Sequence, residues 1–296
     1  MLAEYLLKEL PHSEIPDSGF DGISETLLIS IPNIDTKEGL CLLHRGKLYS
    51  LHIPSCSGLW LEGQKLYVSL LSPDHMRLRI YEPGKTTKEF LNTSIGDIHD
   101  LRIFGGELYA VSTSTNEIVT LSETGTILKR WVFPGIGDSW HINCIDVWGE
   151  KIVVSAFGKF PHFRAYKGRV KEAGIVFDME SQEILQTHLS CPHTPRLDEV
   201  GRKMICDSRT GRLLFFDQDK GKEVMFDGAF TRGIAFSDKH IFVGLSSLRH
   251  RVGIKPGAGT QASAEIGIVD FKTLECLKKV AIPRREIYDV TLLPNN

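Results

Sequence analysis

Short runs of alternating apolar and polar residues, separated by turns rich in Gly, Asp, Asn and Ser, follow one another along most of this 296-residue chain. Such runs are typical of half-buried β-strands, and the turns between them are typical of hairpins. One unit recurs, in which a short apolar strand, a tight polar turn and a second strand rich in β-branched or aromatic residues follow in order. Its clearest copies begin at Ser57, His99, His141, His193 and Thr231.

A second hairpin follows each copy, so one unit is a four-stranded antiparallel meander. These second hairpins begin at Leu78, Glu117, Ala173, Arg212 and Glu265. Successive units start about 37 to 53 residues apart, which is the period of propeller blades with loop insertions. The pattern therefore predicts five complete blades.

The two ends of the chain supply the parts of a sixth blade. Residues 287–294 form a first-strand pattern with no further strands after it, whereas residues 24–31, 40–43 and 47–52 form three strands with no first strand before them. Pairing these ends would close the ring and remove an exposed sheet edge. We therefore expect an all-β fold, a six-bladed β-propeller closed by pairing of the C-terminal strand with N-terminal strands. A β-sandwich is the alternative, but it does not account for a repeat completed by both ends.

The first residues lie outside this repeat. Leu2, Tyr5, Leu6 and Leu10 fall on one face of a short helix. We expect residues 1–20 to be a helical N-terminal extension and residues 21–296 to be the propeller.

Charge and hydropathy narrow the function classes. The formal net charge of −2 favours neither nucleic acid nor an anionic membrane as a partner. No stretch reaches the roughly 18 apolar residues that cross a bilayer, and charged residues interrupt the N-terminus as they do not in a signal peptide. The six cysteines contain no CxxC pair, so we expect free thiols, with disulfides in an oxidising compartment as the alternative. These features predict a cytoplasmic protein, and they leave its oligomeric state open.

The starts of the first strands carry the candidate chemistry. In a propeller the first strand is innermost, so its start lies at the same mouth of the channel as the loop after the second strand. Histidine there can act as a general base, arginine can hold a carboxylate, and tyrosine can donate a proton. The expected catalytic residues are His99, His141, His193, Arg232 and Tyr288.

Two long insertions follow second strands, at residues 158–172 and 247–264, and both should overhang this mouth. Their basic residues favour an anionic or carboxylate-bearing small molecule as the ligand. The expected substrate-binding residues are Asn143, Arg196, Thr231, His162, Arg164 and Arg249. Polar residues that only satisfy backbone groups and channel water are the structural alternative for each residue taken singly.

A divalent cation has two candidate ligand sets. Asp100, Asn143 and Asp289 offer oxygen ligands for Ca²⁺, and His99, His141 and His193 offer nitrogen ligands for Zn²⁺. Neither set has a diagnostic spacing. No Walker sequence, dinucleotide fingerprint or GxSxG elbow occurs, so we expect no nucleotide cofactor.

Three segments, WHINCID, PHTPRLDEVGRKMICDSRTGRL and FTRGIAFSDKHIFVGLSSLR, resemble a bacterial family of conserved, largely uncharacterised six-bladed propeller proteins. The architecture is also distantly similar to the gluconolactonase and strictosidine synthase propellers. That similarity implies chemistry at the central channel, often beside a divalent cation. The acidic metal ligand of those propellers has no assigned counterpart here.

Together these patterns predict an enzyme that acts on a small polar or anionic metabolite at the channel mouth, by hydrolysis, lyase or isomerase chemistry. The alternative is a non-catalytic propeller that binds a small ligand or a protein partner.

Overall fold

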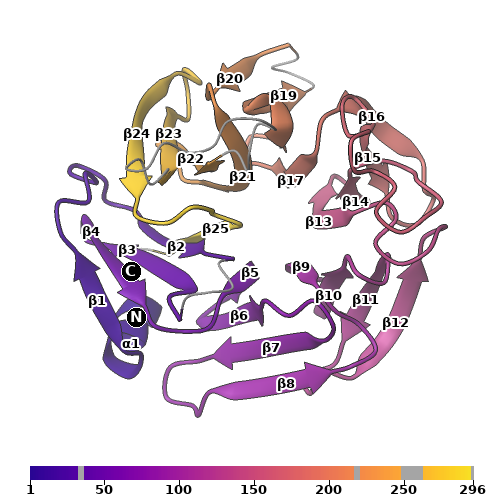
Figure 1. Cartoon of the computed structure of the whole chain (residues 1–296). Coiled ribbons are helices and arrows are strands. Elements are labelled where there is room, and N and C mark those ends of the chain that lie inside the picture. The colour runs from indigo at the N-terminus through magenta and orange to yellow at the C-terminus, as the bar shows by residue number, and fades with distance from the viewer. Residues whose placement is uncertain (33–36, 217–220, 248–262, 295–296) are drawn as a thin grey trace, which may run out of the picture.

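The computed structural model describes residues 1–32, 37–216, 221–247 and 263–294, and it places six antiparallel sheets in a ring (Figure 1). Each of the first five blades consists of four consecutive strands. Blade one contains β5 (Cys56–Glu62), β6 (Lys65–Leu70), β7 (Met76–Tyr81) and β8 (Lys88–Asn92). Blade two contains β9 (Ile98–Phe104), β10 (Glu107–Ser112), β11 (Glu117–Leu121) and β12 (Ile127–Val132).

The next three blades repeat this order. Blade three contains β13 (Ile142–Trp148), β14 (Lys151–Ala156), β15 (Gly174–Asp178) and β16 (Ile184–Leu189). Blade four contains β17 (Pro192–Leu197), β18 (Lys203–Asp207), the 3-10 turn η1 (Ser208–Thr210), β19 (Arg212–Phe216) and β20 (Glu223–Met225). Blade five contains β21 (Ala229–Phe236), β22 (His240–Ser247), β23 (Ala264–Asp270) and β24 (Cys276–Ile282).

Blade six joins the two ends of the chain. Its strands are β25 (Val290–Leu293), β2 (Thr26–Ser30), β3 (Leu40–His44), β4 (Lys47–Leu51) and β1 (His12–Ile15). β2 pairs antiparallel with β25, with Leu28 opposite Thr291. The predicted six-bladed propeller and its closure by the C-terminal strand are therefore confirmed.

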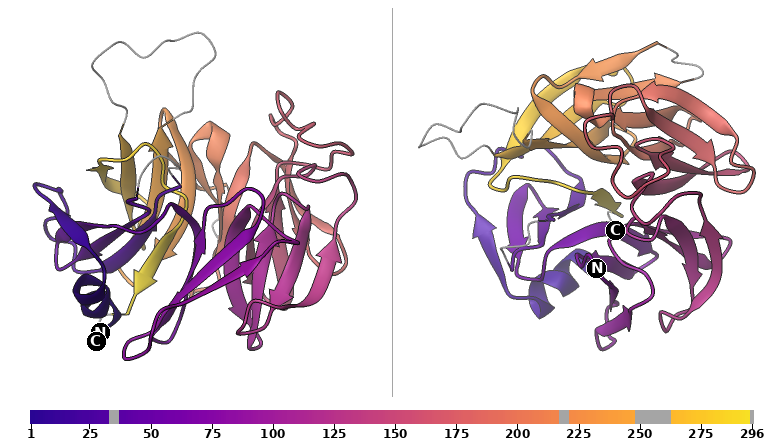
Figure 2. Two further views of the ribbon diagram at one scale, coloured as in Figure 1. Left: turned by 60° about the horizontal axis from the view of Figure 1, so that its bottom comes forward. Right: turned by 45° about the vertical axis from the view of Figure 1, so that its right-hand side comes forward.

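The N-terminal segment lies against this closing blade. It forms helix α1 (Leu2–Glu9), which lies beside the closing blade (Figure 2). Leu2 and Leu6 of this helix are buried in a cluster with Leu28 and Leu293 of blade six. It then forms β1, which pairs with β4 as an additional outer strand. In the part of the chain that the structure describes, no helix is long and apolar enough to cross a bilayer.

Apolar side chains pack between neighbouring blades and hold the ring together. One cluster joins Val111 and Ile118 of blade two to Ile145 and Val154 of blade three. Burial of such side chains contributes about 1.5–3 kcal/mol each. The ring is thus a rigid support for side chains at the channel.

A β-bulge interrupts the first strand of each of the first five blades. The irregularities lie between Cys56 and Leu59, at His99, at Asn143, between His193 and Arg196, and at Gly233. A bulge bends its strand and re-aims the side chains beside it. Side chains of the first strand are therefore re-aimed in five blades.

Candidate functional site at one mouth of the channel

The five residues predicted to be catalytic lie together at one mouth of the channel. The His99 ring lies 5.2 Å from the His141 ring and 5.1 Å from the Tyr288 ring, centroid to centroid. The Arg232 guanidinium lies over the Tyr288 ring, 5.2 Å from its centroid, and the His193 ring lies 6.3 Å from the same Tyr288 ring. The three histidines and Tyr288 lie at or just before the start of the first strands of their blades, and Arg232 is the fourth residue of β21. Closure of the ring brings these residues from five blades together.

The three imidazoles share one hydrogen-bonding arrangement. The Nδ1 atom of His99 lies 3.0 Å from the Asp97 carbonyl, that of His141 lies 2.9 Å from an Asp138 carboxylate oxygen, and that of His193 lies 2.9 Å from the Cys191 carbonyl. Since these oxygens only accept, Nδ1 is the donor in each ring. In the neutral ring, Nε2 then carries the lone pair.

Burial decides the protonation of two of these rings. It lowers the pKa of His141, although the hydrogen bond to Asp138 acts in the opposite direction. It also lowers the pKa of His193, assisted by the positive charge of Arg232. Both imidazoles are therefore neutral near pH 7, with Nε2 free to accept a proton.

Asp138 is the residue that sequence reasoning missed. Its carboxylate is 1% exposed and binds His141 through Oδ1, whereas Oδ2 accepts hydrogen bonds of 2.8 Å from Arg164 Nε and from the Tyr166 hydroxyl. Burial favours the neutral acid, but the hydrogen bonds from these three partners lower the pKa of Asp138. A buried carboxylate thus fixes both His141 and the 158–172 loop.

A pocket of about 400 Å³ opens beside His141 and Arg232. Its other lining residues are Phe157, Tyr166, Lys167, Gly168, Val170, Cys191, Arg209, Phe230, Ser246, Ser247 and Glu286. Among the described residues, three buried polar atoms in this cluster have no partner, namely His193 Nε2, Arg232 Nε and the Tyr288 hydroxyl. A buried polar group gains from a hydrogen bond, and Arg232 is the one of these three residues that lines the pocket.

The backbone is unusual at the same place. Asp97, His141, Cys191 and Thr194 all have positive φ, at 49°, 51°, 56° and 57°. A non-glycine residue in this region costs roughly 1–3 kcal/mol and persists only where its surroundings hold it. Such residues are common at functional sites, and here they adjoin or belong to the histidine cluster.

Three predicted substrate-binding residues serve the protein itself. Asn143 is fully buried, where it accepts from Ser155 Oγ at 2.6 Å and donates to the His141 carbonyl at 3.2 Å. Thr231 is fully buried and donates to the Arg212 carbonyl. Arg164 donates to Asp138, as described above. The partners of these side chains come from other strands or loops, which sequence spacing does not reveal.

The remaining predicted binding residues lie elsewhere. His162 is exposed on the 158–172 loop. Arg196 does not join the pocket, because it follows His193 by three positions and points toward the other end of the channel, where it lies 3.3 Å from Asp146. Arg249 lies outside the described residues.

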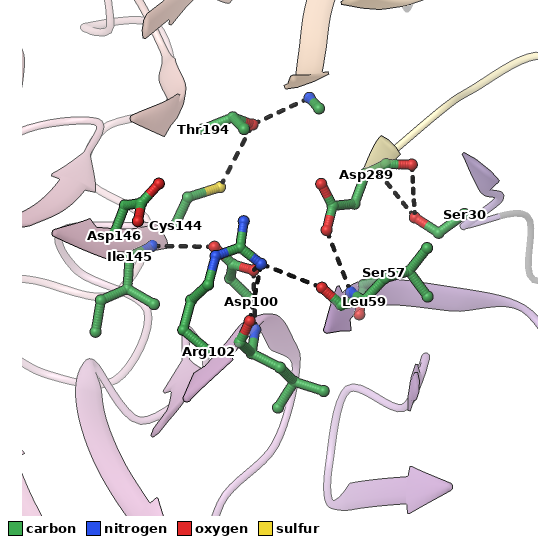
Figure 3. Close-up of polar contacts among 12 residues, drawn as sticks. Ser30, Ser57, Leu59, Asp100, Arg102, Cys144, Ile145, Asp146, Thr194 and Asp289 are labelled. Carbon is green, nitrogen blue, oxygen red and sulfur yellow. Dashed lines mark hydrogen bonds and ion pairs between the residues drawn. The ribbon is translucent and has the colours of Figure 1, made fainter. Parts of the chain in front are cut away.

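Asp100 and Asp289, two of the expected oxygen ligands, bind backbone amides (Figure 3). Asp100 accepts from the amides of Leu101 at 2.9 Å and Ile145 at 3.1 Å. Asp289 accepts from the amides of Val290 at 2.9 Å and Leu59 at 3.2 Å. Each carboxylate therefore ties its own strand to the first strand of the next blade.

These hydrogen bonds occupy the oxygen atoms that a divalent cation would need. All four carboxylate oxygens of Asp100 and Asp289 accept an N–H group, and Asn143 Oδ1 accepts a hydroxyl. Within the described residues, no three His, Cys, Asp or Glu side chains are grouped to hold a metal ion. Neither predicted ligand set fits a divalent cation in this arrangement.

A layer of buried charge lies deeper in the channel. Arg102 lies 3.3 Å from Asp100 and donates to the Leu59 carbonyl at 3.1 Å (Figure 3). Arg196 bridges Asp146 at 3.3 Å and Asp289 at 3.6 Å. Burial raises the pKa of both Asp100 and Asp146 to about 7, against the lowering effect of Arg102. This layer separates the histidine mouth from a second pocket, of about 340 Å³, that Arg102, Asp146 and Arg196 line.

Known structures share this architecture at low sequence identity. A Bacteroides caccae protein of unknown function has 9% identity and a TM-score of 0.62, covering 92% of this chain and 100% of its own. A putative 6-phosphogluconolactonase from Bacteroides fragilis has 13% identity and a TM-score of 0.56, covering 93% and 99%. The calcium-binding protein regucalcin from Agrobacterium tumefaciens has 11% identity and a TM-score of 0.54, covering 80% and 77%. These likenesses show the fold alone.

No curated protein matches the sequence. The predicted membership of a largely uncharacterised propeller family is confirmed by a match over residues 44–296. The chain belongs to the family described as a domain of unknown function, DUF4915.

Proposed function

We propose that this protein is an enzyme that acts on a small anionic molecule by acid–base catalysis at the histidine mouth. The observation that carries the proposal is the Asp138–His141 pair, which stands beside a pocket that also contains a guanidinium group. A base and an anion-binding group at one opening are the two parts that proton-transfer chemistry on an anion requires.

His141 is the proposed general base. Asp138 accepts the hydrogen bond from Nδ1, which fixes the tautomer and leaves Nε2 to take a proton from the substrate or from water. The same carboxylate stabilises the imidazolium that forms. This division of roles is that of the carboxylate–histidine pair in hydrolases.

Tyr288 and Arg232 are the proposed stabilising groups. Burial raises the pKa of Tyr288 well above its usual value, so its hydroxyl remains a hydrogen-bond donor at neutral pH. Arg232, which lines the pocket, can hold the anionic part of the substrate, and the Tyr288 donor behind it can stabilise an oxygen on which negative charge develops once the substrate enters beside Arg232.

A general base can assist each of the three reaction classes. In lactone hydrolysis it takes a proton from the water that attacks the carbonyl carbon, and in elimination or isomerisation it takes a proton from a carbon next to a carbonyl group. The likeness to a putative 6-phosphogluconolactonase makes anionic lactones the first substrates to test, although a shared fold does not determine activity. No step is assigned to a divalent ion, because the candidate oxygen ligands accept hydrogen bonds from the protein.

Non-catalytic ligand binding is the second candidate. The observation that favours it is the aromatic wall formed by Phe157, Tyr166 and Phe230, since such walls bind ligands without chemistry. This candidate predicts binding at the same pocket with no turnover.

Proton release from a panel of anionic lactones and esters would test the proposal. We expect turnover by the wild type and a loss of about 100-fold or more in His141→Gln, since a general base contributes roughly that factor. His12→Gln, an exposed histidine on the outer edge of blade six, is the control and should match the wild type. Turnover that persists in His141→Gln would contradict the site, and saturable binding without turnover would favour the second candidate.

A further inference from the structure

Arg232 is held as a rigid recognition group. Its guanidinium lies 4.6 Å from the Phe230 ring and 5.2 Å from the Tyr288 ring, and its side chain is 14% exposed. Stacking on aromatic rings fixes the plane of a guanidinium without using its N–H groups. Arg232 Nε is buried and has no partner among the described residues, so at least one directed donor remains for a ligand.

The charge around Arg232 favours a single negative charge. Glu286 lies 3.6 Å from Arg232 and offsets part of its attraction for anions. Lys167 and Arg209 also line the pocket and are exposed to solvent, so the pocket remains attractive to an anion overall. A doubly charged phosphate near Arg232 would meet the repulsion of Glu286, whereas a planar carboxylate matches the guanidinium fork with half that charge.

The walls of the pocket suit a ring. Phe157 and Tyr166 stand edge to face at 5.5 Å, and the His141 ring lies 4.2 Å from Phe157. Aromatic rings arranged in this way offer both faces and edges to a further ring. The volume of about 400 Å³ is at the small end of the range for ligand sites and accommodates one compact molecule.

We infer that this pocket takes a small aromatic monocarboxylate, with its carboxylate on Arg232 and its ring against Phe157 and Phe230. The inference rests on the proposed function for the location of the site, and it adds the class of ligand. It follows from the stacked guanidinium, the neighbouring carboxylate and the aromatic walls.

Isothermal titration with three matched probes tests this inference. Phenylacetate carries the carboxylate, phenylacetamide replaces it by a neutral amide, and phenyl phosphate carries a dianion. We expect phenylacetate to bind about tenfold or more tightly than either of the others, since one charge-assisted bidentate contact contributes at least that factor. Equal binding of the amide, or tighter binding of the phosphate, would overturn the inference.

Two variants change the recognition in opposite directions. Arg232→Lys keeps the charge but loses the planar fork, and it should weaken phenylacetate binding about tenfold. Glu286→Gln removes the repulsive carboxylate and should improve binding of phenyl phosphate more than that of phenylacetate. If Arg232→Lys fails to fold, Glu286→Gln still decides, because an unchanged preference between the two anions would contradict the assigned role of Glu286.

Phenylacetate has no hydrolysable bond, so its binding is independent of hydrolysis. Phenylacetamide and phenyl phosphate recovered intact after the titration would show the same for those two probes. Selective phenylacetate binding by the wild type and by His141→Gln, together with no turnover of any substrate, would support the ligand class and fail the proposed enzyme. Turnover of an anionic lactone that is lost in His141→Gln, together with no binding of phenylacetate, would do the reverse and support the enzyme while failing the ligand class.

Discussion

A single buried carboxylate governs the chemistry open to His141. Asp138 holds the Nδ1–H of His141 and is itself kept ionised by Arg164 and Tyr166. Burial alone would disfavour the imidazolium, and the carboxylate partly offsets that effect. The basicity of His141 therefore depends on a residue outside the pocket lining.

Asp138→Asn should lower the pKa of His141 further, because the variant removes the negative charge that stabilises the imidazolium. If the protein is an enzyme, kcat/KM should fall by about 10²–10⁴-fold and its acidic limb should move to lower pH. NMR titration of the His141 ring checks the pKa whether or not a substrate is known. Tyr166→Phe, which keeps the carboxylate, is the control with the smaller shift. An unchanged His141 titration in Asp138→Asn would exclude this positioning role.

The histidines could be predicted as a group because each heads one copy of a repeat, and the ring geometry brings equivalent positions together. Asp138 could not, because it lies in the connection before its repeat and its partners come from an insertion. Asp100 and Asp289 were expected at the channel, yet their oxygens serve amides of the adjacent blades. A sequence shows which residues are polar at a position, but their partners depend on how neighbouring strands are offset.

At the scale of single elements, the bulged first strands let blades approach closely. Gly233 lies in the bulge of β21 with φ of 67°, and a Cβ atom there would lie 2.7 Å from the Val290 amide nitrogen. The bulge also lets the Gly233 amide donate to Thr194 Oγ1 at 3.0 Å. Alternation along the chain predicted the strands, but the bulges add one residue to a register that sequence periodicity treats as uniform.

Gly233→Ala should reduce the free energy of unfolding by about 2–4 kcal/mol, since it combines left-handed backbone strain with a clash against blade six. Gly63→Ala is the matched control, because Gly63 has φ of 59° but a Cβ there meets nothing within 4 Å. It should cost only about 1–2 kcal/mol for the backbone. Urea unfolding of both variants measures the difference. An equal loss of unfolding free energy in both variants would show that the close contact between β21 and β25 adds nothing to the cost of a side chain at position 233.

At the scale of the whole molecule, hydrogen bonds and ion pairs at the channel connect blades that are distant in sequence. Asp289 joins blade six to blade one through Leu59, and Arg196 reaches from blade four to Asp289 across the channel. Arg102 joins blade two to blade one. The paired strands β2 and β25 close the ring at its rim, and this charged layer connects it across its centre.

The charged layer makes stability depend on pH in an unusual direction. Burial raises the pKa of Asp146 to about 7 in the folded protein, from an ordinary value of 3.8. An acid whose pKa is raised on folding contributes stability that is fully present below its unfolded pKa and is lost as the pH rises through its folded pKa. The contribution of Asp146 to the free energy of unfolding should therefore fall as the pH rises from about 4 to about 7.

Asp146→Asn isolates this contribution, because the variant cannot ionise while the histidines that oppose the trend at low pH are common to both proteins. We expect the free energy of unfolding of the wild type, relative to Asp146→Asn, to fall by about 1–3 kcal/mol between pH 4 and pH 8. The Asp146 side chain lines the second pocket and is 18% exposed, which keeps this change in unfolding free energy below that of a fully buried carboxyl group. Denaturant unfolding of both proteins across this range measures the difference. A constant difference would mean that Asp146 stays ionised throughout, held by Arg196 and Arg102, and that the channel layer acts as a fixed set of ion pairs.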